Sequence, residues 1–312
     1  MSLLGIFKGR GANGFGYNST AEEVSEGLDL KGKNYLVTGC NSGLGLETAR
    51  VLILRGARVF GAARSLEKAT ASGAAFGDAF VPIECNLAAP SSIRAAIANL
   101  AQHDVDFDGI VANAGIMSLP HRVTACGAEL QLLTNHLGHF LLVTELLERL
   151  SPTGRVVVLS SVAHKDTYRG GLRLNDLEAE EKYQRWQAYG QSKLANLLFV
   201  RELARRLPEG QGAYAVHPGV IATGITRHLP RFLAWAFEKV GPSIAAKTIA
   251  EGAATQVYTV AHPDAAAING AYWADVNPAR SSAYGEDMAL AEALWLRSEA
   301  WVEAHGKPDT RT

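Results

Sequence analysis

The feature that most constrains this chain is a glycine-rich loop between a buried strand and a helix. The stretch YLVTGCNSGLG at residues 35–45 joins a β-branched run directly to an amphipathic segment. Gly39 allows a tight turn, Gly43 lets the backbone approach a phosphate, and Gly45 lets the helix pack closely on the strand. The helix N-terminus offers unpaired N–H groups and partial positive charge to an anion. The loop therefore predicts a strand–turn–helix unit that binds the pyrophosphate of a dinucleotide.

The rest of the chain alternates short β-branched runs with longer amphipathic stretches, which is typical of βαβ units and a parallel sheet. No linker rich in Pro, Ser or Gly interrupts this order. We expect one α/β domain at 31–305, an N-terminal extension at 1–30 and a flexible tail at 306–312. The predicted strands are 35–38, 58–62, 80–84, 109–112, 155–160, 213–217 and 271–274. The predicted helices are 43–55, 91–102, 127–150, 187–207 and 245–261.

Composition excludes several classes of protein. The 312 residues are 47% hydrophobic and 20% charged, with a net charge of -1, so the chain can bury a large core but offers no basic field to a nucleic acid. The longest apolar runs are too short to span a membrane. The three cysteines lack metal-type spacing and read as buried residues of a reducing compartment. We expect a cytoplasmic protein with no nucleic-acid partner, no metal site and no membrane span.

The end of the second predicted strand selects between nicotinamide cofactors. A carboxylate there would hydrogen-bond the ribose hydroxyls of NAD, whereas an arginine pairs with the 2'-phosphate of NADP. This strand ends in Ala62, Ala63 and Arg64. The sequence therefore favours NADP (NADPH) over NAD, with Arg64 on the phosphate and Ser42 assisting. A solvated Arg64 close to Glu67 is the alternative.

Five polar residues converge on the same predicted sheet edge. Tyr189 and Lys193 are four positions apart on a helix, so they share one face. Ser160 and Ser161 end a buried strand at the carboxyl edge of the sheet, where open α/β sheets bind ligands. Asn135 lies on the preceding long helix and faces the same crevice. The spacing of Tyr189 and Lys193 alone would also fit an ordinary amphipathic helix.

Together these motifs resemble the short-chain dehydrogenase/reductase superfamily. The matching features are the Thr-Gly-x-x-x-Gly-x-Gly loop from Thr38, ANAG at 112–115, HPG at 217–219 and the four residues Asn135, Ser161, Tyr189 and Lys193. GCNSGLGLETA, TNHLGHFLL, SSVAH and SKLANLLF are similar to the branch that contains retinol dehydrogenases and the WW-domain oxidoreductase. The resemblance implies a single-domain Rossmann-type fold, a doubly wound parallel sheet of about seven strands with helices on both faces.

The resemblance also implies a role for each of the four residues. Tyr189 would give its proton to a carbonyl oxygen while a hydride arrives from the nicotinamide. A free tyrosine has a pKa of about 10, and the Lys193 ammonium would favour the phenolate and lower that pKa. Lys193 would also hold the ribose, Ser161 would polarise the substrate oxygen, and Asn135 would position a water in a proton relay.

Two positions depart from the family pattern. Ala112 replaces the first of two asparagines, and Asn86 stands where an aspartate often contacts adenine. An Asn86 oxygen can still accept from the adenine amine, so we expect modest weakening. The expected cofactor-binding residues are Gly39, Asn41, Ser42, Gly43, Leu44, Gly45, Arg64, Asn86, Leu87, Asn113, Ala114, Gly115, Tyr189, Lys193, Pro218, Gly219, Val220 and Thr223.

The substrate end has an apolar character. After the HPG turn, ITRHLPRFLAWAFEKVGPS is apolar nearly all round and corresponds by resemblance to a substrate lid near 224–245. A dimer contact and a membrane-surface dock are its alternatives, and a homo-oligomer stays open. Tyr168 and Tyr183 are either pocket wall or core. The expected substrate-binding residues are Met117, Ala163, Trp186, Phe232 and Trp235.

The leading hypothesis is an NADP-dependent oxidoreductase that interconverts an apolar, fairly bulky alcohol and its ketone or aldehyde. A non-catalytic NADP(H)-binding sensor or scaffold is the alternative, although it has no need of all four chemical groups. An epimerase or dehydratase of the extended type would need a larger C-terminal region than the chain provides. His164 and His217 fit loop and turn residues that hydrogen-bond the backbone better than they fit an acid/base role.

Overall fold

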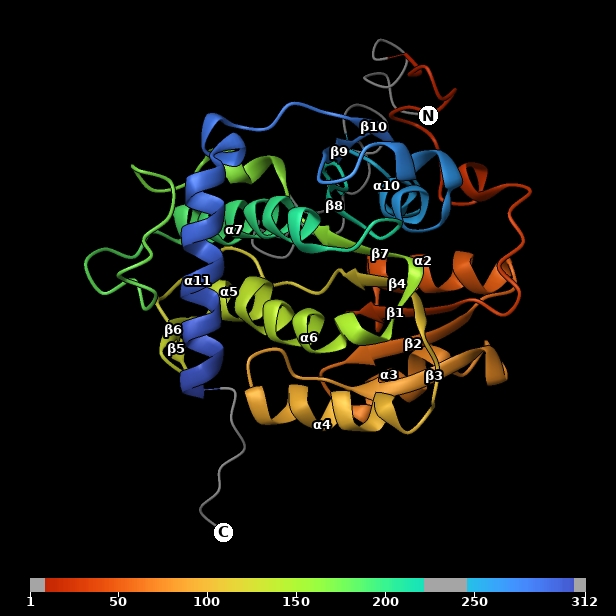
Figure 1. The fold of residues 1–312 in the computed structure, drawn as a ribbon, viewed down its shortest axis with the longest axis horizontal. Coiled ribbons are helices and arrows are strands. Elements are labelled where there is room, and N and C mark those ends of the chain that lie inside the picture. The colour runs from red at the N-terminus through yellow and green to blue at the C-terminus, as the bar shows by residue number, and fades with distance from the viewer. Residues whose placement is uncertain (1–8, 222–245, 306–312) are drawn as a thin grey trace, which may run out of the picture.

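The computed structural model describes residues 9–221 and 246–305 and contains one large central sheet (Figure 1). Its strand order is β10-β9-β8-β7-β4-β1-β2-β3, and every pair is parallel except β9 with β10. A separate hairpin is formed by β5 (Thr124–Ala125) and β6 (Ala128–Glu129). The sheet strands are β1 (Asn34–Thr38), β2 (Arg58–Ala63), β3 (Phe80–Glu84), β4 (Phe107–Ala112), β7 (Leu150–Leu159), β8 (Gly212–His217), β9 (Tyr272–Ala274) and β10 (Asn277–Pro278).

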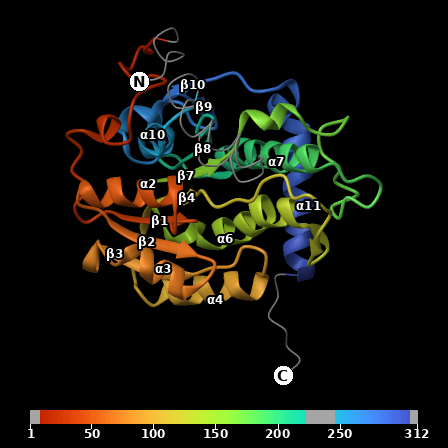
Figure 2. The ribbon, with the colours of Figure 1, turned by 180° about the vertical axis from the view of Figure 1, so that it is seen from behind.

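Helices cover both faces of this sheet (Figures 1 and 2). Successive strand residues point to opposite faces, so Leu36 packs in one core cluster while Tyr35 and Val37 pack in the other. Burial on both faces explains the continuous apolar strands. One face carries α4 (Pro90–Ala101), α6 (Gly138–Leu146), α7 (Arg185–Arg206) and α11 (Met288–His305). The other carries α2 (Gly43–Leu54) and α10 (Ile249–Ala261), and α3 (Leu66–Gly73) packs on β2 and β3 at the sheet edge.

The predicted fold class is confirmed, with differences in some elements. The sheet has eight strands rather than about seven, because β10 pairs antiparallel with β9. Strand β7 begins at Leu150, five residues before the predicted start, because Leu150 pairs with Phe107 across a bulge. The helix expected at 127–150 is interrupted: β6 is followed by α5 (Leu130–Leu132), a π-helical turn at Leu133–Leu137, then α6.

Helices α3 and α11 were not among the helices predicted from the sequence. Helix α11 buries Ala291, Leu294, Trp295, Ser298 and Trp301, which follow helical spacing. The polar Ser298 lies inside that buried stripe, and Leu296 on the opposite side is 57% exposed, so the apolar pattern does not mark one face. No described helix is long and apolar enough to cross a membrane.

The N-terminal segment packs on the domain over its described residues 9–30. Ala21, Val24 and Leu30 are buried in the core cluster beneath α2 and α10. Asn13 Nδ2 donates to the Val276 carbonyl at 2.7 Å, and the Ala21 N–H donates to a carbonyl of α10 at 2.9 Å. The predicted lid near 224–245 and the tail at 306–312 lie outside the described residues.

Candidate functional site

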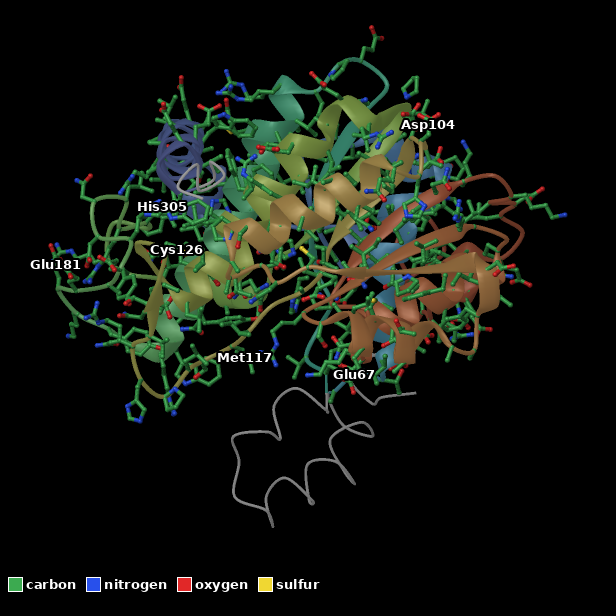
Figure 3. The ribbon with its side chains drawn as sticks, turned by 90° about the horizontal axis from the view of Figure 1, so that it is seen from below. Glu67, Asp104, Met117, Cys126, Glu181 and His305 are labelled. Carbon is green, nitrogen blue, oxygen red and sulfur yellow. The ribbon has the colours of Figure 1, made fainter. Side chains whose placement is uncertain are left out.

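A cleft of about 570 Å³ opens at the carboxyl edge of the sheet, where the sequence placed the cofactor. Figure 3 shows Met117 and Glu67, which follow β4 and β2, at one edge of the molecule, with Asp104, which precedes β4, on the opposite side. The residues that line the cleft are Thr38, Gly39, Asn41, Ser42, Leu44, Ala63, Arg64, Lys68, Cys85, Asn86, Leu87, Ala88, Asn113, Ala114, Gly115, Ile116, Thr134 and Leu159.

The glycine loop has the geometry that the sequence predicted. Gly39 and Gly43 have φ values of +68° and +58°, which side chains rarely adopt. A Cβ on Gly39 would lie 2.9 Å from the Ala114 Cα, and a Cβ on Gly45 would collide with the Gly39 carbonyl oxygen. Close packing between β1, α2 and the segment after β4 therefore depends on these glycines.

Thr38 fixes the segment after β4, which forms one wall of the cleft. Its hydroxyl accepts from the N–H groups of Asn113 and Ala114, each at 3.0 Å. The Asn113 side-chain amide donates to the Thr38 carbonyl at 2.8 Å. The single asparagine that remains in ANAG is thus tied to β1, and Ala112 is simply a buried strand residue.

Two cationic side chains line the cleft at the end of β2. Arg64 was predicted, and Lys68, in the first turn of α3, was not. Their spacing of four residues was visible in the sequence and could have indicated a shared face. Among the described residues neither side chain forms an ion pair, although Glu67 lies between them in the sequence. Asn86 lines the same cleft, and its Oδ1 accepts from the Ala88 N–H at 3.2 Å.

The four proposed catalytic residues are brought together beside Gly115. A Cβ on Gly115 would lie 3.1 Å from Asn135 Oδ1 and 3.6 Å from Lys193 Nζ. Lys193 Nζ lies 5.7 Å from the centroid of the Tyr189 ring and donates to the Leu159 carbonyl at 2.9 Å. The Ser161 hydroxyl is hydrogen-bonded to the Tyr189 phenol.

Asn135 lies in the π-helical turn, and its side chain is fully engaged. Its Oδ1 accepts from the Ile116 N–H at 2.8 Å, and its Nδ2 donates to the Ile116 carbonyl and to Ser192 Oγ, both at 2.9 Å. The amide therefore clamps the segment after β4 to α7. This use of both amide atoms explains why an asparagine is needed there. The main-chain carbonyl of Asn135 pairs with a different residue, His139.

Burial sets the ionisation of the central pair. Burial raises the pKa of Tyr189 to about 12, against a smaller lowering by the hydrogen bond with Ser161. Burial lowers the pKa of Lys193 to about 8. The raised pKa of Tyr189 is opposite in direction to the lowering expected from the neighbouring ammonium, because loss of hydration outweighs the hydrogen bond with Ser161.

The remaining predicted cofactor residues lie around the cleft rather than on its lining. Gly43 and Gly45 form the loop itself, and Tyr189 and Lys193 lie behind Gly115 and Leu159. Pro218, Gly219 and Val220 follow β8 at the same edge, with Gly219 at a φ of +88°. Thr223 lies outside the described residues.

On the substrate side, the described residues surround Tyr189 and Ser161. The Trp186 ring lies edge-on to Tyr189, with centroids 6.5 Å apart, and is 46% exposed. The Ala163 N–H donates to Ser161 Oγ at 3.2 Å, and Met117 adjoins the Ile116 clamp. Phe232 and Trp235 lie outside the described residues.

Four further residues were given two readings from the sequence. Tyr168 is core, with the Arg173 guanidinium 4.0 Å above its ring. The half-buried Tyr183 donates to the Leu119 carbonyl at 2.7 Å. His164 and His217 both hydrogen-bond the backbone, as expected of loop and turn residues. No group of His, Cys, Asp or Glu in the described ranges could hold a metal ion.

Comparison with known proteins agrees with this geometry. Residues 33–172 match the family model described as short chain dehydrogenase. The chain is 37% identical to the short-chain dehydrogenase TIC 32 A, chloroplastic, of Brassica napus, over 97% of this chain and 99% of the relative. It is 38% identical to human retinol dehydrogenase 12, over 86% and 85%.

Two solved structures are similar to this one. An uncharacterized protein from Mycobacterium paratuberculosis superposes with a TM-score of 0.73 at 33% identity, covering 91% of this chain and 98% of that one. A blue fluorescent protein from a metagenomic library, in complex with NADPH, gives a TM-score of 0.62 at 25% identity, covering 79% and 97%.

Proposed function

Because the chain belongs to the short-chain dehydrogenase family, we propose that it is an NADP-dependent oxidoreductase that interconverts an apolar, fairly bulky alcohol and its ketone or aldehyde. The carrying observation is that Asn135 and Lys193 meet beside Gly115, next to a dinucleotide-sized cleft, while Tyr189 lies beside Lys193 and is hydrogen-bonded to Ser161. A binding protein would need the cleft but not a hydrogen-bonded serine and tyrosine next to a buried lysine.

In reduction, Tyr189 gives its phenolic proton to the substrate oxygen as that oxygen gains negative charge. A bound NADPH supplies the hydride. The phenol is protonated at neutral pH because burial raises its pKa to about 12, so it is ready to act as the acid. Ser161 donates a hydrogen bond to the same oxygen and polarises the carbonyl. In oxidation the same groups act in reverse.

Lys193 has two proposed tasks. Its ammonium holds the nicotinamide ribose, which would replace the present contact with the Leu159 carbonyl. Its positive charge, with that of the oxidised nicotinamide, lowers the pKa of Tyr189 when the phenol must act as a base. Asn135 joins the segment after β4 to Ser192, the neighbour of Lys193 in the chain, and, in this proposal, positions a water that relays protons to solvent.

The preference for NADP rests on Arg64 and Lys68. Both side chains line the cleft at the end of β2, the place at which dinucleotide-binding folds read the adenosine ribose. Two cations without ion-pair partners among the described residues favour a phosphate there over two hydroxyls. Ser42, also on the lining, adds a hydroxyl donor.

The apolar substrate class rests on side chains beside the catalytic residues. Trp186, Val162 and Val220 are 46%, 47% and 40% exposed, and each is next to Tyr189, Ser161 or the turn after β8. Exposed apolar side chains that gather at a site indicate a ligand or a covering segment. We further propose a cytoplasmic location and no nucleic-acid partner, based on the net charge and on three unpaired cysteines, of which Cys126 is exposed and not buried as expected.

The direct test is the loss of NADPH absorbance, and separately of NADH absorbance, with aromatic, terpenoid, steroid and aliphatic aldehydes and ketones. We expect oxidation of NADPH with bulky apolar carbonyls. Tyr189→Phe is the control: it should bind NADPH but lose turnover by about 10²- to 10⁴-fold. NADPH binding without turnover across the panel would instead support the sensor.

A further inference from the structure

The buried ring of His139 joins the π-helical turn that carries Asn135 to Thr38 at the end of β1, beside the cleft. Its Nδ1 is 3.0 Å from the main-chain carbonyl oxygen of Asn135, and its Nε2 is 2.9 Å from the Thr38 hydroxyl. A carbonyl oxygen can only accept, so Nδ1 carries the proton and Nε2 accepts from Thr38. Thr38 is the residue that holds Asn113 and Ala114 on the cleft wall.

His164 has the same arrangement on a different element, the 3₁₀ turn Val162–Lys165. Its Nδ1 is 2.6 Å from the main-chain carbonyl oxygen of Ser161, and its Nε2 accepts from the Ser282 N–H at 3.0 Å. Because an amide N–H can only donate, Nε2 is unprotonated and Nδ1 carries the hydrogen. Both rings are completely buried. Burial also lowers the pKa of each, that of His139 to about 4, so both are neutral near pH 7.

We propose that His139 and His164 are positioning residues for the reaction, each fixing through Nδ1–H the main-chain carbonyl of one catalytic residue, Asn135 or Ser161. This inference rests on the proposed function. The carbonyl fixes the peptide plane that follows each residue. The plane after Asn135 belongs to the helical turn that carries this residue, and the Asn135 side chain clamps Ile116. The plane after Ser161 sets the direction of the chain toward Ala163, whose N–H donates to the Ser161 hydroxyl.

Positioning residues are needed because the reacting groups of a catalytic site must be held in place within a fraction of an ångström. Ser161 Oγ and the Tyr189 phenol must meet the same substrate oxygen, and a shift of about 1 Å can lower turnover by about 100-fold. The backbone at both residues leaves regular secondary structure: Asn135 lies in a π-helical turn, and Ser161 caps a 3₁₀ turn. At both residues a side-chain donor adds a restraint on the carbonyl, and the Ser161 carbonyl also accepts from the His164 main-chain N–H at 3.0 Å.

The chain provides a matched control in His136. It lies in the same π-helical turn and is equally buried, but its Nε2 meets Ser298 Oγ of α11 at 3.0 Å. It makes no hydrogen bond to the main-chain carbonyl of Asn135, Ser161, Tyr189 or Lys193 among the described contacts. A loss of stability alone should therefore affect all three histidine sites alike, whereas a positioning role separates His136 from the other two.

The experiment replaces each of the three histidines by Asn and by Gln. The Asn amide reaches the position of Nδ1, and the Gln amide reaches that of Nε2. At His139 and His164 we expect Asn to keep kcat close to wild type and Gln to lower it by about 10- to 100-fold. At His136 the two variants should have equal kcat, whatever their thermal stability. NADPH affinity, measured by fluorescence titration, should fall for His139→Asn, which removes the acceptor of the Thr38 hydroxyl, and should fall less for His139→Gln, whose amide oxygen replaces Nε2. It should stay unchanged for both His164 variants.

The outcomes separate two failures. If wild-type protein turns over no carbonyl of the panel, the proposed function fails, and the inference fails with it. If wild type is active but Asn and Gln lower kcat equally at His139 and His164, or lower it at His136 as well, only the positioning roles are overturned. If one position tolerates neither variant, the other decides by the same comparison.

Discussion

Single polar side chains in this protein often belong to one element and hydrogen-bond the backbone of another. Thr38 ends β1, yet its hydroxyl arranges the backbone after β4. Asn135 belongs to a helix, yet its amide holds Ile116 on a neighbouring loop. A polar side chain that satisfies buried backbone groups costs little to bury, and removing it leaves those groups unpaired. Changes at such residues should therefore affect the cleft as well as local stability.

The cations at the end of β2 give a cofactor prediction. Arg64→Glu and Lys68→Glu should each weaken NADPH binding much more than NADH binding, because a carboxylate repels the 2'-phosphate and accepts from ribose hydroxyls. Arg58→Glu, the same charge change at the opposite end of β2, is the control and should leave the ratio of the two affinities unchanged. The measurement is fluorescence titration with both cofactors. Equal weakening of both would remove Arg64 and Lys68 from the phosphate site.

His136 gives a prediction for stability against pH. Burial lowers its pKa from 6.5 to about 3, so between these values the unfolded chain binds a proton that the folded chain does not. Stability therefore falls as pH drops below 6.5, by about 1.4 kcal/mol per unit for this group. Between pH 7 and pH 5 wild type should lose about 2 kcal/mol more than His136→Leu. Urea unfolding at the two pH values measures the difference, and parallel curves would contradict it.

The residues that could be predicted from the sequence are those whose chemistry and spacing are both distinctive. Tyr189 and Lys193 combine a helical spacing with two reactive groups, and Gly39 and Gly43 mark a turn that other residues adopt rarely. Lys68 was missed although its spacing from Arg64 was visible, whereas Cys85 and His139 could not be assigned, because each has a plain explanation as a buried residue. Their importance depends on which distant residues they meet, and only tertiary structure decides that.

At the scale of elements, the interrupted helix after the β5–β6 hairpin positions Asn135 and His139. A uniform helix would keep each carbonyl in its regular hydrogen bond, whereas the π-helical turn at Leu133–Leu137 rotates Asn135 and His139 toward neighbouring parts of the cleft. The sequence predicted a helix here from its apolar residues, which follow helical spacing through the turn. It could not predict the extra residue in the turn, because one inserted residue leaves an almost wholly buried apolar segment looking the same.

Gly138 gives a prediction for this element. It begins α6, and a Cβ there would collide with the Leu87 carbonyl on the cleft lining. Gly138→Ala should therefore push α6 away from the segment after β3, at a cost of about 1–3 kcal/mol in stability, and weaken NADPH binding. Ala101→Gly, at the exposed end of α4, serves as a control for a simple change in helix propensity. Destabilisation with unchanged NADPH affinity would show that the collision is absorbed away from the cleft.

At the scale of the whole molecule, the described part of the N-terminal segment is integrated with the far end of the sheet. Phe15 packs edge-on against Tyr258 of α10 with ring centroids 5.8 Å apart, and Asn277 Nδ2 donates to the Phe15 carbonyl at 3.1 Å. The sequence separated residues 1–30 from the domain because they are polar and rich in glycine. Composition could not show that the partners of this segment lie about 260 residues later.

Deletion of the segment tests its contribution. Removal of residues 1–18 should lower the free energy of unfolding by about 3–5 kcal/mol, comparable to losing one buried aromatic side chain, because it removes Phe15 and the buried Tyr17. Removal of residues 1–8 alone is the comparison, since the described contacts begin after them. Chemical unfolding of both truncated proteins measures the effect. Equal loss in the two would show that residues 9–18 contribute nothing.

The pairing of residues near the two ends also orders the events of biosynthesis. Asn13 and Phe15 leave the ribosome first, but their hydrogen-bonding partners Val276 and Asn277 are translated when most of the chain already exists. The early strands can pair while synthesis continues, since a chain folds progressively from its N-terminus. The leading segment must wait, exposed to chaperones and proteases, until the final strands emerge. Completion of this seam therefore requires β9 and β10, and nascent chains that stop before β9 should remain open to proteolysis within residues 9–18.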